Sequence, residues 1–252
     1  MKIGITERGD AGLDLSWFDK ITEGYVDGAI LVTKSMSDLF NLKVADLYHN
    51  GFRNIIVHCT CTGWGASVLE PKVAHYSKQL QQLKNLIAMG FPESHCVLRI
   101  DPIIPTDEGL RRVEAVLDLA DKMDIIPKSR IRVSVLDEYN HVKDRFRNID
   151  FDCCYPEGKK FASYKQMQYV KSVLSKYPYL FECCAEPYLL GDNFIQTGCI
   201  SNTELALFNL KDDTLTANPQ NRKGCNCYSC KTELLQIKHR CSNQCAYCYW
   251  LD

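Results

Sequence analysis

Asn54-Ile55-Ile56-Val57-His58-Cys59 is a short apolar run rich in β-branched residues, and it decides the fold class. The stretch 71–89 follows it, with a proline in its first turn, apolar residues on one face and Gly90 after its end. These features predict an amphipathic helix. A second apolar run, 96–100, comes next. A strand, a helix and a strand in this order predict a parallel βαβ unit.

The same alternation extends along the chain in both directions. Further strands are predicted at 2–6, 29–33, 131–136, 180–184 and 233–238. Further helices are predicted at 15–25, 37–50, 163–176, from Thr106, and from the capping box Ser201-Asn202-Thr203-Glu204. Residues 137–156 and 211–224 are predicted to be polar connections. We therefore expect one α/β domain over 1–252, a single parallel (β/α) barrel that is TIM-like or partial, with an open doubly wound sheet as the alternative.

The composition is that of an ordinary globular protein. The chain has 252 residues, 46% of them hydrophobic, and a formal net charge of −1. This balance gives no general attraction to nucleic acid or to anionic membranes. No apolar run approaches the length of a membrane span, and residues 1–4 open a predicted strand and not a signal peptide. We expect a cytoplasmic protein, and in a reducing cytosol clustered cysteines favour metal or redox chemistry over disulfides.

Polar residues recur just after the predicted strands. In parallel barrels this end of the sheet carries the chemistry. Each such residue alone is explained as a turn, a helix cap or a solvated side chain, but together they would ring one barrel mouth. We assign catalytic roles to Asp101, Asp137 and Glu186. Cofactor or substrate binding is assigned to Arg8, Lys34, Thr60 and Thr62.

The cysteines are concentrated near the end of the chain, in a segment that covers 225–252. Six of the fourteen lie between Cys225 and Cys248. The stretch Cys241-Ser242-Asn243-Gln244-Cys245-Ala246-Tyr247-Cys248 has the spacing Cys-x3-Cys-x2-Cys, which resembles the signature of radical S-adenosylmethionine (SAM) enzymes. The resemblance implies that Cys241, Cys245 and Cys248 hold three irons of a [4Fe–4S] cluster. The fourth iron would then bind SAM, and reductive cleavage of SAM would start radical chemistry on an unknown substrate.

The position of this motif differs from that in the radical SAM superfamily. There it usually follows the first strand, whereas here it follows the last. In a closed barrel the last strand neighbours the first, so a permuted order would reproduce the same geometry.

A zinc site is the alternative interpretation of these cysteines. Cys227-x2-Cys230 and Cys245-x2-Cys248 also fit a zinc ribbon, with His239 as a spare ligand. The protein would then be a non-enzymatic iron–sulfur or zinc protein, whose metal centre is structural or a redox sensor within an assembly.

Motifs along nearly the whole chain resemble the family catalogued as domain of unknown function 1848. They are Arg8 and Asp10, Thr33-Lys34, Thr60-Cys61-Thr62-Gly63-Trp64-Gly65, Glu70-Pro71, Arg99-Ile100-Asp101-Pro102-Ile103, 134–139, 184–186, 198–200, 225–227 and 241–249. The resemblance implies a barrel that ends in a cysteine cluster. It also implies four further cysteine ligands, which a second cluster would use: Cys184, Cys199, Cys225 and Cys227.

Two details of that resemblance bear on function. Cys230 lies outside the family pattern, which weakens the zinc-ribbon interpretation. The stretch Thr6-Glu7-Arg8-Gly9 stands where members usually carry paired arginines, which implies a difference in specificity if the second basic residue binds substrate.

The partners follow from weaker signals. Residues 221–252 are mildly basic, and Tyr247, Tyr249 and Trp250 have rings that stack on bases in single-stranded nucleic acid complexes. Nucleic acid is therefore one candidate substrate. The favoured interpretation is that these rings cover a cluster or pack the end of the barrel. A protein partner is implied only by the non-enzymatic alternative.

Overall fold

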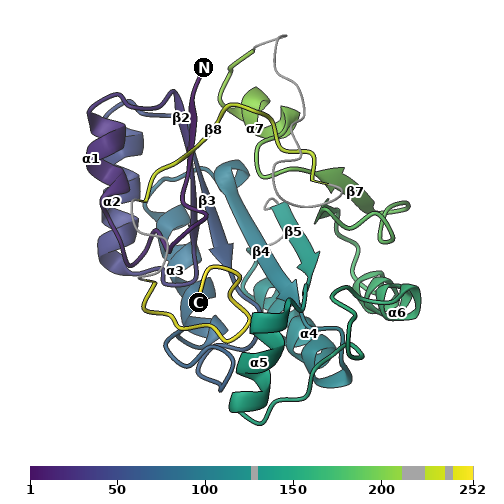
Figure 1. The fold of residues 1–252 in the computed structure, drawn as a ribbon. Helices are drawn as coiled ribbons and strands as arrows, with labels where there is room; N and C mark the ends of the chain where they lie inside the picture. The colour runs from purple at the N-terminus through teal and green to yellow at the C-terminus, as the bar shows by residue number, and fades with distance from the viewer. Residues whose placement is uncertain (126–129, 212–224, 236–240, 252) are drawn as a thin grey trace.

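One parallel sheet forms the centre of the protein (Figure 1). The computed structural model describes residues 1–125, 130–211, 225–235 and 241–251. Its eight strands are β1 (Ile3–Ile5), β2 (Gly28–Thr33), β3 (Ile55–Thr60), β4 (Cys96–Ile103), β5 (Arg130–Val135), β6 (Phe181–Cys184), β7 (Phe194–Thr197) and β8 (Lys231–Glu233). The strand order is β7-β6-β5-β4-β3-β2-β1-β8, and every neighbouring pair is parallel.

The helices connect successive strands, as parallel pairing requires. They are α1 (Trp17–Thr22), α2 (Asp38–His49), α3 (Tyr76–Ala88), α4 (Asp107–Lys122), α5 (Asn140–Asn148), α6 (Tyr164–Leu174) and α7 (Asn202–Leu207), with a short 3-10 helix at Glu93–His95. Among the residues that the structure describes, no helix has the length and apolar character to cross a membrane.

The predicted α/β class with a parallel sheet is confirmed, but closure of the sheet into a barrel is not. β1 to β7 follow in chain order, and β8 lies on the other side of β1, so the order of this open sheet changes once, between β1 and β8. Within the described ranges, β7 and β8 remain the two unpaired edges. The segments beside these edges do meet, because the amide of Tyr228 donates to the carbonyl of Ile200 over 3.1 Å.

The two faces of the sheet have different partners. On the outer face, residues such as Val57 and Leu98 pack against Leu83 of α3 and Val116 of α4. On the inner face, a second buried cluster joins the first three strands to the α7 region. Its members include Ile5, Ile30, Ile56, Leu205 and Phe208. The segment from β7 through α7 therefore covers the inner face of the sheet.

Buried charges tie α7 to the inner face. Alternate residues of β5 point to one face, so Arg130 and Arg132 lie together. Arg132 is fully buried, and its Nη2 lies 2.6 Å from Glu182 Oε2 and 2.9 Å from Glu204 Oε1. Glu204 also closes the predicted capping box of α7, which is confirmed. This network fixes the chain that follows Cys199 against β5 and β6.

The sequence prediction was wrong in three places. The segment 137–156 was predicted to be a polar connection, but it contains α5. The helix was missed because Val142 and Phe146 are the only large apolar residues that it buries, and they stand among charged residues. β7 was missed because it has four residues, of which the middle two are exposed. The helix predicted from Pro71 begins at Tyr76, since 66–73 form turns.

Several predicted features lie partly outside the described residues. The predicted strand 233–238 is replaced by β8 at Lys231–Glu233, and residues 236–240 are not described. His239 and the connection 212–224 also lie outside the described residues.

Candidate functional site

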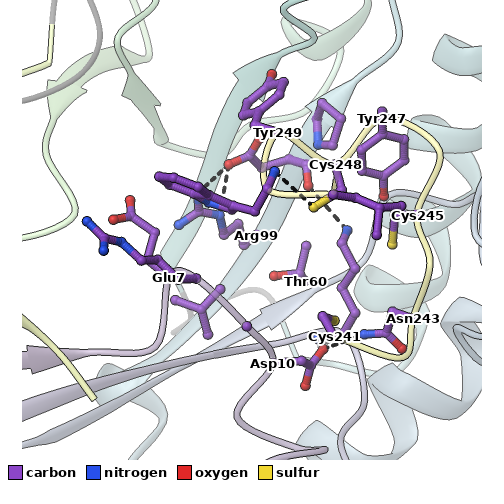
Figure 2. Close-up of a pocket in the computed structure, with 18 of the residues that line it drawn as sticks. Glu7, Asp10, Thr60, Arg99, Cys241, Asn243, Cys245, Tyr247, Cys248 and Tyr249 are labelled. Atoms are coloured by element: carbon purple, nitrogen blue, oxygen red, sulfur yellow. Dashed lines mark hydrogen bonds and ion pairs between the residues drawn. The ribbon is translucent and has the colours of Figure 1, made fainter. Parts of the chain in front are cut away.

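A cavity of about 450 Å³ opens at the carboxyl ends of the strands (Figure 2). Its wall includes strand-end residues and the segment 241–251, which we call the cysteine loop. Of the residues predicted from the sequence, those that line it are Arg8, Lys34, Thr60, Asp101, Asp137, Cys184, Cys199, Cys225, Cys227, Cys241, Cys245 and Cys248. Thr62 and Glu186 do not line it. The volume lies within the range of small-molecule sites.

The cysteine loop meets the ends of the first two strands because β8 pairs with β1. Asp10, which follows β1, makes the connection. Its carboxylate accepts hydrogen bonds from Thr33 Oγ1 at 2.6 Å, from the amide of Lys34 at 2.8 Å and from Asn243 Nδ2 at 2.7 Å. A loop that follows the last strand is thereby held beside the first, as the permuted order predicts.

Glu70 anchors the other end of the loop. Its buried Oε1 accepts hydrogen bonds from Thr62 Oγ1 at 2.8 Å, from Lys34 Nζ at 3.0 Å and from Tyr247 Oη. Thr62 therefore binds Glu70 and does not face the cavity. Burial alone would lower the pKa of Lys34, but the charges of Glu70 and Cys245 outweigh it and raise that pKa above its ordinary value. Lys34 is a fixed cation beside the thiols.

The thiols of Cys241, Cys245 and Cys248 come from one loop and line one cavity (Figure 2). Burial raises the pKa of Cys241 and Cys245, and the Lys34 ammonium opposes this rise in both. The amide of Trp250 donates to Cys248 Sγ over 3.4 Å. Soft sulfur ligands with cations and amide donors nearby suit an iron–sulfur cluster, because hydrogen bonds and nearby charge stabilise its sulfurs.

A second group of thiols lies in another part of the same wall. Cys225 and Cys227 approach to 3.3 Å between their sulfurs, and the amide of Cys199 donates to Cys227 Sγ over 3.0 Å. Hydrogen bonds from Cys184 and Cys227 lower the pKa of Cys199, and Cys227 lowers that of Cys225 to about 6. The structure thus brings together four cysteines from three separate segments.

The zinc ribbon expected from the sequence is not assembled at the cavity. In the part of the chain that the structure describes, no three His, Cys, Asp or Glu side chains are gathered around one ion position. In addition, Cys230, which the zinc ribbon requires, does not line the cavity, whereas its partner Cys227 does.

The acidic residues predicted to be catalytic have different surroundings. The Asp101 carboxylate lines the cavity and accepts from Arg99 Nε at 3.0 Å and from Arg99 Nη2. Asp137 lines it too, and its amide donates to Tyr249 Oη at 2.9 Å. The carboxylate of Glu186 instead accepts from Ser134 Oγ at 3.0 Å and from the amide of Val135 at 2.8 Å. Glu186 is therefore held against β5, away from the lining of the cavity.

The aromatic residues of the loop are largely engaged inside the protein. Tyr247 is buried against Glu70, and the Tyr249 ring meets Tyr139 edge to face with centroids 5.3 Å apart. The Arg8 guanidinium lies over Trp250, 5.4 Å from the ring centroid, at the cavity mouth. These contacts agree with the interpretation that the rings pack the end of the sheet.

Sequence reasoning missed the roles of Glu70, Arg99 and Lys231. Arg99 alternates with apolar residues along β4, and that alternation was a usable signal for an inward-facing charge. Glu70 lies on a loop with no periodicity. Lys231 opens a strand that the sequence placed two residues later, and it pairs with Glu7 beside Cys199.

The fold and site define a class: a parallel α/β protein with a thiol-rich cavity at the carboxyl ends of its strands. Comparison with known families matches residues 19–250 to the family described as Domain of unknown function (DUF1848). The chain belongs to this family, as its motifs predict. No curated protein matches the chain.

Proposed function

We propose that the protein is a cytoplasmic iron–sulfur enzyme of the radical SAM type, with a [4Fe–4S] cluster on Cys241, Cys245 and Cys248. One observation carries the proposal: the three thiols of the Cys-x3-Cys-x2-Cys motif line one cavity together with polar residues from the strand ends. The proposal includes a sheet that curves as a partial barrel, with the segments beside β7 and β8 in contact. When bound, the cluster supplies the electron that cleaves SAM reductively.

The remaining residues bind, orient and exclude water. Lys34 lies beside Cys245 as a fixed cation, and its Nζ also donates to the carbonyl of Asp101 at 3.3 Å. Thr60 and Asp137 line the cavity and offer polar atoms to the ribose and amino groups of SAM. Arg8 also lines the cavity, and its guanidinium can bind a carboxylate of the bound molecule. The aromatic cover of Tyr249 and Trp250 limits the entry of water, which radical chemistry requires.

The decisive experiment is a titration of SAM into reduced, cluster-replete protein. We expect a changed electron paramagnetic resonance spectrum and the release of 5′-deoxyadenosine and methionine, even without substrate. An unchanged spectrum with no 5′-deoxyadenosine would favour the non-enzymatic alternative, and stoichiometric zinc without iron would favour the zinc protein.

We propose a second cluster on Cys184, Cys199, Cys225 and Cys227. It is supported by the position of these four thiols on one cavity wall and by two neighbouring cations, Arg99 and Lys231, whose charges lower the pKa of Cys199. Four thiolates would saturate such a cluster and leave no iron open to SAM.

Iron analysis separates the two clusters. A variant with Cys241, Cys245 and Cys248 all changed to Ala is expected to fold and to retain about half of the wild-type iron, because each cluster takes four irons. The far-ultraviolet circular dichroism spectrum is the control for folding. A folded triple variant without iron would show that the second group of cysteines holds no cluster.

A further inference from the structure

One side chain, Arg145 of α5, contacts the cysteine loop at three points. Its Nε donates to the carbonyl of Ala246 at 2.8 Å, and its two terminal nitrogens donate to the carbonyls of Cys248 and Leu251. The carbonyls of Ala246 and Cys248 belong to the turn that carries Cys245 and Cys248. The guanidinium therefore bonds to the backbone of this turn.

The local fold of α5 fixes the direction of Arg145. Val142 and Phe146 are four residues apart on one face of the helix and are buried. They belong to the same buried cluster as Cys245, Ala246 and Tyr247. The helix therefore packs directly on the cysteine loop, and Arg145, next to Phe146, is held half-buried against the loop backbone.

The contacts also orient the amides of the loop. With the carbonyls of Ala246 and Cys248 turned toward Arg145, the amide of Cys248 closes a turn to the carbonyl of Cys245 at 3.0 Å. The amide of Trp250 then points to Cys248 Sγ at 3.4 Å. A guanidinium holds five donors in a rigid plane, whereas a lysine ammonium holds three donors on one freely rotating nitrogen, so arginine is better suited to three carbonyls at fixed spacing.

We infer that Arg145 is a positioning residue that sets the spacing of the Cys245 and Cys248 thiols and keeps an amide directed at Cys248 sulfur. This inference rests on the function proposed above, because the thiols so positioned are the proposed cluster ligands. Arg145 acts through the loop backbone, by its hydrogen bonds to the carbonyls of Ala246, Cys248 and Leu251.

The test compares Arg145→Met with Arg147→Met in cluster-replete protein. Arg147 is a matched control on the same helix, because it is 53% exposed and pairs only with Asp144 and Glu157 among the described residues. We expect Arg145→Met to lose the iron of this cluster to a chelator faster than wild type, because removing a group that orients metal ligands lowers metal affinity by about 10–100-fold. Its cluster midpoint potential is expected to fall, since an amide directed at sulfur favours the reduced state.

Chemical rescue distinguishes positioning from general destabilisation. In Arg145→Ala, added methylguanidinium is expected to slow the loss of iron, whereas Arg147→Met should behave like wild type throughout. Wild-type iron kinetics and midpoint potential in Arg145→Met would overturn the inference.

A measurement without metal keeps this inference separate from the proposed function. In metal-free protein, alkylation of Cys248 by iodoacetamide, followed by mass spectrometry, is expected to be several-fold faster in Arg145→Met, with Cys241 little changed. If wild-type protein never holds iron, the proposed function fails, and this result still decides whether Arg145 holds the loop. Equal alkylation of Cys248 in the two proteins would overturn the inference.

Discussion

Replacement of Cys245 by Ala is expected to remove the cluster at the cysteine loop. Protein purified without oxygen should be brown and absorb broadly in the blue, and Cys245→Ala should lose the iron and absorption of that cluster. The physical reason is that Cys245 is the middle one of the three proposed ligands and lines the cavity beside Lys34. A neutral methyl group offers no electron pair to iron, so two thiols remain where the cluster requires three.

Cys153→Ala is the matched control for this experiment. Cys153 is half-buried and does not line the cavity, so its loss should leave both iron and absorption at wild-type levels. Equal iron in wild type and Cys245→Ala would mean that the cysteine loop is not the ligand set.

Replacement of Glu70 by Ala is expected to produce a large loss of stability. The change leaves the partly buried Lys34 ammonium without its carboxylate and removes the acceptor of Thr62 and Tyr247. Breaking a buried ion pair from one side costs about 3–5 kcal/mol of unfolding free energy. Urea unfolding of metal-free protein measures the change.

The double variant Lys34→Met, Glu70→Leu is the control, because it removes both charges together. It should be less destabilised than Glu70→Ala, since no buried charge is left unpaired. If Glu70→Ala loses less than about 1 kcal/mol, the level of an exposed ion pair, the pair is not an anchor of the loop.

The pH dependence of this pair has a definite sign. The pKa of Lys34 in the folded protein is above its ordinary value, so the folded state binds this proton more tightly than the unfolded state does. The stabilisation is complete below the ordinary lysine pKa and is lost as the pH rises through the folded value. Unfolding free energies of wild type and Lys34→Met should therefore converge in strongly alkaline solution.

The strands and longer helices could be predicted because their signals are local. The run 54–59 and the helix that begins after Thr106 carry their periodicity and caps within a few residues. β7 and α5 lack such signals, because their apolar residues are few and are buried only by distant partners. Closure of this sheet depends on contacts between its edge strands β7 and β8, which no local pattern encodes.

Most of the residues that line the site could be predicted from the sequence, but the contacts that hold them together could not. Strand-end polar residues and the cysteine spacing pointed to most of the cavity lining. The contact of Tyr247 with Glu70 joins residues 177 positions apart, and that of Arg145 with Ala246 joins residues 101 apart. Such pairs depend on how loops cross in space. Glu186 shows the converse, because its place after a strand suggested a position in the cavity, whereas it does not line the cavity and accepts hydrogen bonds from β5.

The order of the strands has a consequence for biosynthesis. The cysteine loop follows β8, so a ribosome makes every strand of the sheet before it makes Cys241, Cys245 and Cys248. During translation the nascent sheet therefore lacks these thiols. Asp10 and Glu70 are made long before Asn243 and Tyr247, which donate hydrogen bonds to them in the folded protein. A message cut short after β8 would yield a sheet whose cavity lacks one wall.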